Sequence, residues 1–317
     1  MTSFPLSIKS VVAAEARIRK SAIGPLVASV AYWIWHKGWD LFFSIRAMRK
    51  GNFANVRIGG LDFQYDMRDR AVGRIVYIFR EYETREVEVL AQNLIEGMNF
   101  IDIGANSGFF TIIASKLVGS SGKVLAFEPS QDNMRILRSN IEANDLQNVE
   151  AIESAVCEAE RQVTLHLSKI NPGDHRTYQS DDARILNAGS PRETIQVAGT
   201  SLDEFLSCTR IDADVIKMDI QGAEHHALMG MRDTITNREN ILLMTEYWPR
   251  GLRAAGSSPS GFLADLHRSG FHFFVAGDYG QLTEVYLDDI ESNLTEDEHA
   301  TIFCSRVIGR FSRSGLE

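Results

Sequence analysis

The stretch that decides the fold is NFIDIGANSGFF, residues 99–110. An apolar strand ends at Ile103, the chain turns from Gly104 to Gly108, and a helix follows directly. The two glycines permit a tight turn and let a ligand approach the backbone closely. The spacing is not the G-x-G-x-x-G pattern that cradles a pyrophosphate, so a dinucleotide fold is not indicated. Because strand–glycine–helix turns occur throughout α/β proteins, this stretch alone predicts an α/β fold but no particular ligand.

A second signal follows the next apolar run. The apolar run 124–127 is followed by Glu128 and Pro129, and Glu128 lies 24 positions beyond Gly104. Adenosine-binding folds place a carboxylate at this point, where it accepts hydrogen bonds from the ribose hydroxyls. The alternative is a solvated glutamate at a strand end. Taken with the first stretch, Glu128 predicts a site for a nucleoside-containing cofactor.

From residue 98 onward, short apolar runs alternate with helical segments, as in βαβ units around a parallel sheet. The expected strands are 99–103, 123–127, 149–155, 214–218, 241–246, 271–276 and 301–307, with a further antiparallel candidate over 163–167. The expected helices are 84–96, 109–117, 131–144, 201–207, 223–232 and 261–267. We therefore predict an α/β fold with a doubly wound, mostly parallel Rossmann-like sheet, an antiparallel last strand and a helical N-terminal extension.

Three segments are expected along the chain. Residues 1–50 form a helical extension that is both basic and apolar, and residues 51–97 hold lead-in strands and a helix. The main α/β domain occupies residues 98–310. Within it, the stretch 168–195 is irregular and rich in Gly, Pro, Asp and Ser. Long irregular sections of α/β enzymes are often lids or binding loops, so this stretch is assigned to the substrate.

Composition narrows the class of protein. The chain has 317 residues with a formal net charge of −9, which argues against sequence-independent nucleic-acid binding because that needs a strongly basic surface. Its three cysteines, Cys157, Cys208 and Cys304, are far apart and odd in number. They suggest neither zinc nor a disulfide framework. A reducing, cytoplasmic compartment is the simplest expectation, with no nucleic-acid partner.

The N-terminal segment leaves two alternatives open. Residues 21–35 are an apolar stretch preceded by basic residues, but it ends in Trp33, Ile34 and Trp35 rather than in a small-residue cleavage site. It is also shorter than the ~20 residues that a membrane span needs. One alternative is a helix that packs on the main domain or on a partner subunit. The other is an amphipathic helix on a membrane surface. Residues 15–50 are therefore expected to give self-association or peripheral contact with the inner membrane face.

Further motifs appear in a fixed order along the chain. They are Glu83, DIGANSG at 102–108, FEP at 127–129, SLDEFL at 201–206 and IKMDIQGAE at 216–224. This set resembles the FkbM-type methyltransferases, which are class I S-adenosyl-L-methionine-dependent O-methyltransferases of polyketide and glycan pathways. The resemblance covers roughly residues 80–250. One position departs from it: the family usually has glutamate where this chain has Gln221, whereas Glu224 matches the second glutamate of the motif.

The resemblance implies a methyltransferase sheet that binds S-adenosyl-L-methionine, and it implies site residues. The cofactor-binding residues that it implies are Glu83, Asp102, Gly104, Asn106, Gly108, Glu128, Ser154 and Ala155. The catalytic candidates are Lys217, Asp219, Glu224 and Glu246, at or near the carboxyl ends of expected strands. In open α/β sheets that edge faces the ligand crevice.

Methyl transfer to oxygen needs alignment of the acceptor and removal of its proton. Asp219 is the favoured base or acceptor-orienting residue, although a helix cap or an ion pair with Lys217 is the alternative. His225 and His226 are adjacent, so at most one of them can face the site from a helix. The expected acceptor is a small-molecule, glycan or glycolipid hydroxyl.

Other interpretations of the same residues remain open. Asp219, Glu224 and Glu246 could offer oxygen ligands to a magnesium-type ion, but nothing in their spacing requires one, and no metal is expected. A nitrogen methyltransferase is disfavoured because no Asn/Asp-Pro-Pro-aromatic motif is present. Gln221 keeps open a catalytically silent scaffold or partner subunit.

Overall fold

The computed structural model describes residues 24–70, 72–168, 171–179 and 192–307, apart from the side chains of residues 24–36. The chain divides into two compact units, residues 1–82 and 83–317. The division falls inside the segment 51–97. Among the described residues, no helix has both the length and the apolar character needed to cross a bilayer.

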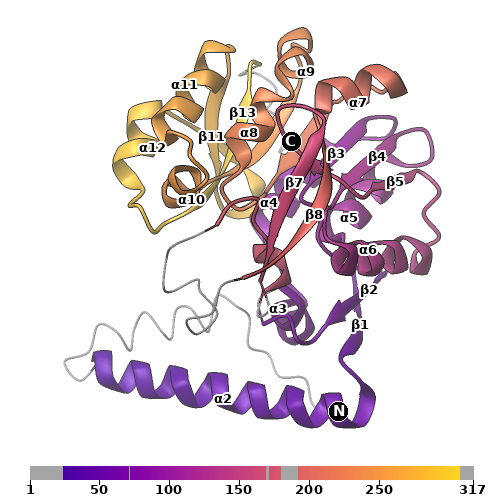
Figure 1. The fold of residues 1–317 in the computed structure, drawn as a ribbon, viewed down its shortest axis with the longest axis vertical. Coiled ribbons are helices and arrows are strands. Elements are labelled where there is room, and N and C mark those ends of the chain that lie inside the picture. Colours follow the sequence, from indigo (N-terminus) through magenta and orange to yellow (C-terminus); the bar gives the residue numbers. More distant parts are fainter. Residues whose placement is uncertain (1–23, 71, 169–170, 180–191, 308–317) are drawn as a thin grey trace, which may run out of the picture. The chain divides into compact units, whose positions relative to one another are not determined.

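The first unit holds one long helix, a hairpin and a short helix. α2 (Gly24–Lys50) runs as one continuous helix of 27 residues (Figure 1). β1 (Phe53–Ile58) and β2 (Leu61–Asp66) pair antiparallel and are the expected lead-in strands. α3 (Val72–Phe79) was missed, because its eight residues were too short a window for a helical period to stand out.

An eight-stranded sheet forms the frame of the second unit. Its order is β12-β11-β13-β10-β9-β3-β4-β5. The strands are β3 (Asn99–Ile103), β4 (Lys123–Phe127), β5 (Val149–Ile152), β9 (Val215–Met218), β10 (Leu242–Tyr247), β11 (His272–Ala276), β12 (Leu282–Val285) and β13 (Ala300–Ser305). The five strands from β5 to β10 are parallel, and β13 is antiparallel between β10 and β11. The predicted α/β class and the antiparallel last strand are confirmed.

Helices cover both faces of this sheet because successive strand residues point to opposite sides. On one face Ile101 and Ile103 share a core with α7 (Leu202–Thr209), α8 (Glu224–Met229), α9 (Arg232–Asn237) and α11 (Pro259–Arg268). The other face carries α4 (Thr84–Asn93), α5 (Phe109–Val118) and α6 (Gln131–Ala143), where α6 packs on Ala126. Strand order reverses between β3 and β9, which is where open α/β sheets bind ligands.

Residues 155–200 contribute a second, three-stranded sheet, which includes the expected strand over 163–167. β7 (Arg161–Leu167) and β8 (Glu193–Thr200) pair antiparallel, and β6 (Ala155–Val156) joins β8 in parallel. The expectation of one strand over 149–155 was wrong, because the chain leaves the large sheet after Ile152 and enters the small one at Ala155.

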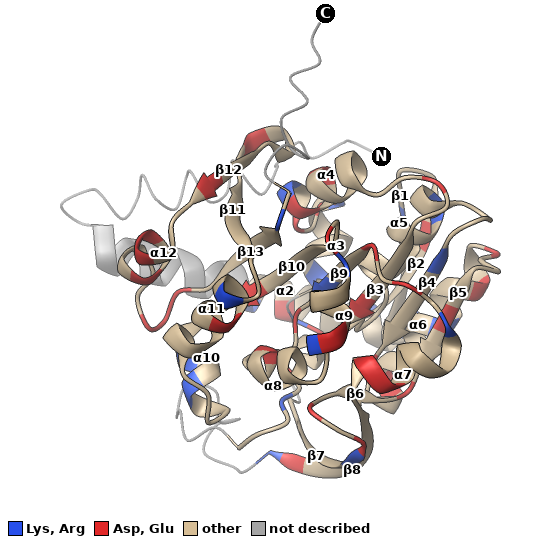
Figure 2. Ribbon diagram, turned by 90° about the horizontal axis from the view of Figure 1, so that it is seen from above, with Lys and Arg blue, Asp and Glu red and all other residues tan. Residues whose placement is uncertain are grey.

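The single helix expected over 223–232 was also wrong. It divides at Gly230 into α8 and α9, and only glycine fits at that point, because a Cβ at Gly230 would sit 2.0 Å from the Cys157 carbonyl oxygen. Three short elements near the end were missed: α10 (Pro249–Ala254), β12 and α12 (Leu287–Asn293). Acidic residues stand in α7 and α12 (Figure 2).

Candidate active site

The floor of the site is a contact between two turns. Gly104 follows β3 and has φ +85°. A Cβ there would lie 2.1 Å from the carbonyl oxygen of Asp219, the residue after β9. Only glycine combines that conformation with that approach at low cost. The backbone N–H of Asp219 also donates to the Ile103 carbonyl at 3.1 Å. The two strand ends are thereby joined at the point where strand order reverses.

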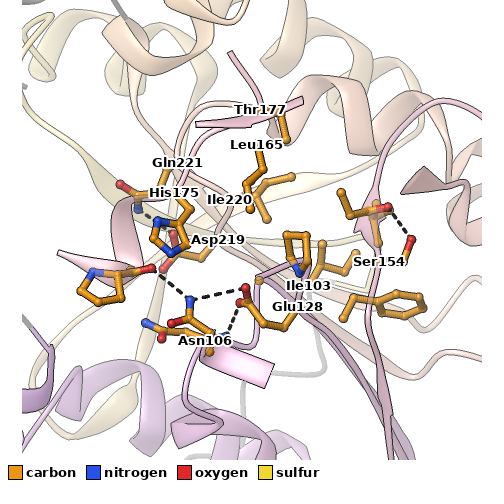
Figure 3. Close-up of a pocket in the computed structure, with 18 residues that line it drawn as sticks. Ile103, Asn106, Glu128, Ser154, Leu165, His175, Thr177, Asp219, Ile220 and Gln221 are labelled. Atoms are coloured by element: carbon orange, nitrogen blue, oxygen red, sulfur yellow. Dashed lines mark hydrogen bonds between the residues drawn. The ribbon is translucent and has the colours of Figure 1, made fainter. Parts of the chain in front are cut away.

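A pocket opens above this contact, and Glu128 is its principal acceptor (Figure 3). One carboxylate oxygen accepts from the backbone N–H of Asn106 and the other from that of Ser130, both at 2.8 Å. The Asn133 amide is a third, longer donor at 3.4 Å. A carboxylate has about four acceptor positions, so capacity remains for a ribose hydroxyl. Burial raises the pKa of Glu128 to about 7, against the pull of the two backbone donors.

Asp102 precedes Ile103 of the pocket lining in β3, and it is buried and does not line the pocket. Its Oδ2 accepts from Thr111 Oγ1 of α5 at 2.6 Å, whereas its Oδ1 has no hydrogen-bond partner among the described residues. Burial raises the pKa of Asp102, and the neighbouring Lys217 ammonium opposes that shift. A buried, unsatisfied carboxylate oxygen suits a cationic ligand group, so the donor set fits the ammonium end of S-adenosyl-L-methionine.

A short segment covers the pocket. Pro172, Gly173, His175 and Thr177 contribute to its lining, and the Asn133 amide donates to the Pro172 carbonyl at 3.0 Å. The space inside the pocket measures about 50 Å³. That is far below the ~300 Å³ at which drug-sized ligand pockets begin, so a bound cofactor needs more room than the pocket has in this structure. Some of the irregular stretch 168–195 thus lies over the cofactor pocket, while residues 169–170 and 180–191 lie outside the described residues.

The structure divides the implied cofactor-binding residues into three places. Lining the pocket are Gly104, Asn106, Glu128, Ser154 and Ala155. Asp102 and Gly108 do not line it, and Gly108 is the residue before α5. Glu83 lines a different cavity.

That second cavity, of about 370 Å³, opens at the carboxyl ends of β9 and β10. Its polar walls include Glu83, Lys217, Asp219, Glu246 and His299. His299, which precedes β13, places its Nδ1 2.9 Å from an oxygen of Glu246. The sequence did not single out His299, because its nearness to Glu246 depends on the antiparallel register of β10 and β13.

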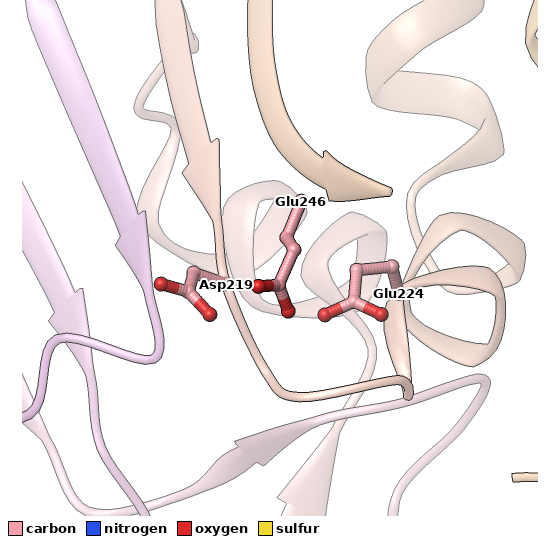
Figure 4. A group of neighbouring side chains, drawn as sticks. All are labelled: Asp219, Glu224 and Glu246. Carbon is pink, nitrogen blue, oxygen red and sulfur yellow. The ribbon is translucent and has the colours of Figure 1, made fainter. Parts of the chain in front are cut away.

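Asp219, Glu224 and Glu246 gather into one acidic group (Figure 4). Gln221 bridges two of them: its amide donates to Asp219 Oδ1 at 2.9 Å and to Glu246 Oε2 at 3.4 Å. Glu224 is fully buried and lines neither cavity. One of its oxygens accepts from the backbone N–H groups of Ile220 and Gly222, so it holds the turn after β9.

Burial and neighbouring charges shift the pKa values of the residues in and beside this acidic group. Burial, and then Glu246, raise the pKa of Glu224 to about 8. Burial and Asp219 raise the pKa of Glu246, which His299 opposes. Burial lowers the pKa of Lys217, but Asp219, 3.6 Å away, and Asp102 more than reverse this. Lys217 is therefore a fixed cation between the two cavities.

The acidic group could hold a cation, since one carboxylate oxygen of each residue lies within 4.8 Å of the others. It also has positive and donor partners of its own in Lys217, the Gln221 amide and His299. These partners serve Asp219 and Glu246, whereas the second carboxylate oxygen of Glu224 is buried with no hydrogen-bond partner among the described residues.

The adjacent histidines point elsewhere. His225 lies 2.9 Å from Asp265 of α11, and His226 contacts Glu158 and the Ala255 carbonyl. Neither lines a described cavity.

Comparison with known proteins agrees with this geometry. The model of the Methyltransferase FkbM domain matches residues 102–273, more than half of the chain. A probable cobalt-precorrin-6B C(15)-methyltransferase (decarboxylating) of Sulfurisphaera tokodaii is 34% identical over 157 residues, which are 45% of this chain and 82% of that protein. Methyltransferase 1 of Beauveria bassiana is 26% identical over 147 residues, 42% of this chain and 58% of that one.

Among solved structures, the methyltransferase FkbM from Methylobacillus flagellatus matches with a TM-score of 0.39 and 16% identity. The match covers 66% of this chain and 44% of that one. The domain match covers more than half of the chain and so decides the assignment: the chain belongs to the FkbM methyltransferase family and uses S-adenosyl-L-methionine as its methyl donor.

Proposed function

We propose that this methyltransferase acts on a hydroxyl oxygen of a sugar, glycolipid or polyketide-type acceptor, held in the cavity between Glu83, Glu246 and His299. The observation that supports this most is the position of Asp219, which lines both the cofactor pocket and the second cavity. The Asp219 side chain can therefore reach a ligand in either cavity.

The lining of the second cavity favours a polar acceptor. Its charged and hydroxyl-bearing residues are Glu83, Arg85, Glu86, Lys217, Asp219, Thr245, Glu246, His299 and Thr301. Carboxylate, guanidinium and hydroxyl groups offer both acceptors and donors, as a polyhydroxylated ligand needs. An apolar acceptor would leave these groups without partners, which costs binding free energy.

The cofactor supplies an activated methyl group, so the protein has two tasks: to align the acceptor oxygen and to receive its proton. Alignment can supply a large part of the rate. For the proton, Glu246 is the better-placed base in the structure, because it faces the cavity and is supported by His299 at 2.9 Å. Asp219 is held by Lys217 and by the Gln221 amide, an arrangement that suits orientation of the acceptor.

The test is methyl transfer from labelled S-adenosyl-L-methionine to a panel of sugars, glycolipids and hydroxylated polyketides. With an accepted substrate, Glu246→Gln should lower kcat by about 100-fold, the lower end of the general-base range, while the Kd for S-adenosylhomocysteine stays within a few-fold.

A matched control is available on the surface. His272 and Glu284 form the same contact, 2.9 Å long, between β11 and β12 and outside both cavities. Glu284→Gln should leave kcat unchanged. If the cofactor binds but no hydroxyl acceptor of the panel is methylated, the proposal fails, and methylation of nitrogen or carbon, or a silent scaffold, takes its place.

A further inference from the structure

The exposed face of α2 is unusual in this molecule. Nine large apolar side chains are exposed among the described residues, and four of them lie within the eight residues Leu41–Met48. These are Leu41 (63% exposed), Phe42 (45%), Ile45 (40%) and Met48 (80%). Scattered exposed apolar residues are ordinary, but a contiguous set marks an interaction surface.

The four residues form one stripe, because positions separated by three and four residues share a side of a helix. The opposite side is the one that packs within the first unit. Phe43 is buried there with its ring 5.7 Å from that of Tyr77, and the Arg46 guanidinium donates to the carbonyls of Gly51 and Phe53. The apolar stripe is therefore not the face that holds α2 in its own unit.

The charged side chains of α2 also differ between its packed side and its exposed side. Asp40 is the one acidic residue in the helix, and it faces inward, 2.6 Å from Arg74 and 3.4 Å from Arg70. The cations Lys37, Arg49 and Lys50 are exposed. Arg49 and Lys50 have no ion-pair partner among the described residues. Lys37 lies four residues before Leu41 and Arg49 four residues after Ile45, so these two cations share the side of the stripe. That side carries no exposed acid, in a chain whose net charge is −9.

We infer that this face of α2 lies on an anionic lipid surface, with Leu41, Ile45 and Met48 entering the acyl boundary and the cations contacting headgroups. A second copy of the helix is the weaker partner, because it would bring the same cations together without a carboxylate between them. Basic helices with an apolar face bind in the plane of a membrane, by apolar burial and by attraction to anionic headgroups. The inference concerns attachment and is independent of the acceptor proposed above.

Vesicle flotation of the full chain tests the inference. Vesicles of phosphatidylcholine with about one-third phosphatidylglycerol should bind the protein, and vesicles of phosphatidylcholine alone should bind it about tenfold less. Added salt should weaken binding to the anionic vesicles. Equal binding to both vesicle types, or binding to neither, would overturn the inference.

Two variants separate the contributions. Leu41→Ser/Ile45→Ser/Met48→Ser removes the stripe, and Lys37→Glu/Arg49→Glu reverses the positive charge beside it; each should reduce the partition coefficient about tenfold or more. The matched controls are Ile95→Ser/Met229→Ser/Tyr286→Ser, three exposed apolar residues of the second unit, and Lys123→Glu/Arg135→Glu, two exposed cations there. Both controls should float like the parent.

Folding and self-association are checked in parallel. Circular dichroism must show unchanged helix content in the serine variant, and sedimentation without lipid reports oligomeric state. A dimer that the serine substitutions dissociate, together with no vesicle binding by the parent, would assign the stripe to a second copy and refute lipid attachment.

Discussion

Tyr178 donates its phenolic hydroxyl to the backbone carbonyl of Gln221 at 2.7 Å. The bond ties the segment that covers the cofactor pocket to the turn that carries the acidic group. On the same segment, the Arg176 guanidinium lies 4.8 Å from the ring centroid of Trp248. Movement of the cover therefore has to break this hydrogen bond and separate the guanidinium from the indole ring.

Loss of the Tyr178 hydroxyl should speed cofactor exchange. Removing one such hydrogen bond costs about 1 kcal/mol, so Tyr178→Phe should raise the dissociation rate of S-adenosylhomocysteine about fivefold. Trp248 fluorescence, followed by stopped flow, reports the opening because Arg176 leaves its ring. The exposed Tyr279→Phe is the control and should exchange like the parent. An unchanged rate in Tyr178→Phe would mean that the segment is not the barrier.

Cofactor affinity should depend on pH through Glu128. Its pKa is raised to about 7, so the carboxylate that we expect to accept ribose hydroxyls is lost as pH falls through that value. Affinity for S-adenosylhomocysteine should therefore drop about tenfold between about pH 8 and about pH 6. His175, whose pKa burial lowers to about 4, stays neutral over this range.

Calorimetric titration at several pH values measures this dependence. Glu128→Gln should bind more weakly at high pH and lose the slope between about pH 6 and pH 8. Asp102 and Glu224 also carry raised pKa values. If the affinity of Glu128→Gln still changed between about pH 6 and pH 8, the pH dependence would belong to one of these two carboxyl groups and not to Glu128.

Gln221→Glu should destabilise the fold more at high pH. The change removes donors to Asp219 and Glu246 and adds a third charge beside them. A carboxyl placed there has its folded pKa raised above the unfolded value, so the penalty is small at low pH and grows as pH rises. We expect about 1–3 kcal/mol of lost unfolding free energy at about pH 8.5 and less at about pH 5.5.

Urea denaturation at the two pH values gives the comparison, and Gln221→Ala is the matched control. It removes the same donors without adding charge, so its penalty should change less with pH. A pH-independent difference between Gln221→Glu and Gln221→Ala would contradict the charge argument.

Gly104→Ala should cost far more stability than Gly256→Ala. Both glycines have φ +85°, but a Cβ at Gly104 meets the Asp219 carbonyl at 2.1 Å, whereas one at Gly256 has nothing within 4 Å. Strain alone should cost about 1 kcal/mol at Gly256, and the collision should raise the cost at Gly104 to about 3 kcal/mol or more. Equal urea midpoints for the two variants would show that the Gly104–Asp219 contact can relax.

The parallel strands could be predicted because each is a short apolar run between turn and helix signals. β8 could not, because most of its residues are exposed or half-buried and its structure depends on pairing with β7, from which residues 168–192 separate it. α12 and β12 are short and partly exposed, so they give weak periodic signals.

The residues of the site likewise divide into those that the sequence predicts and those that it does not. Residues adjacent to strand ends, such as Gly104, Glu128 and Asp219, could be placed because sheet topology fixes where parallel strands end. The role of Glu224 could not, since the turn after β9 brings its oxygen to the backbone of Ile220 only in the folded chain. His299 escaped notice because β10 and β13 are separated by more than fifty residues, and their register brings Glu246 opposite Thr301.

The place of β13 has a consequence for biosynthesis. This strand is made after every other strand of the large sheet, yet it inserts between β10 and β11 rather than adding to an edge. During translation, β10 can pair with β9 and β11 with β12, but the facing edges of β10 and β11 must stay open until residues 300–305 leave the ribosome. His299 arrives with the same insertion, so the second cavity gains its last wall only when β13 joins the sheet, whereas every residue that lines the first pocket has been made by then.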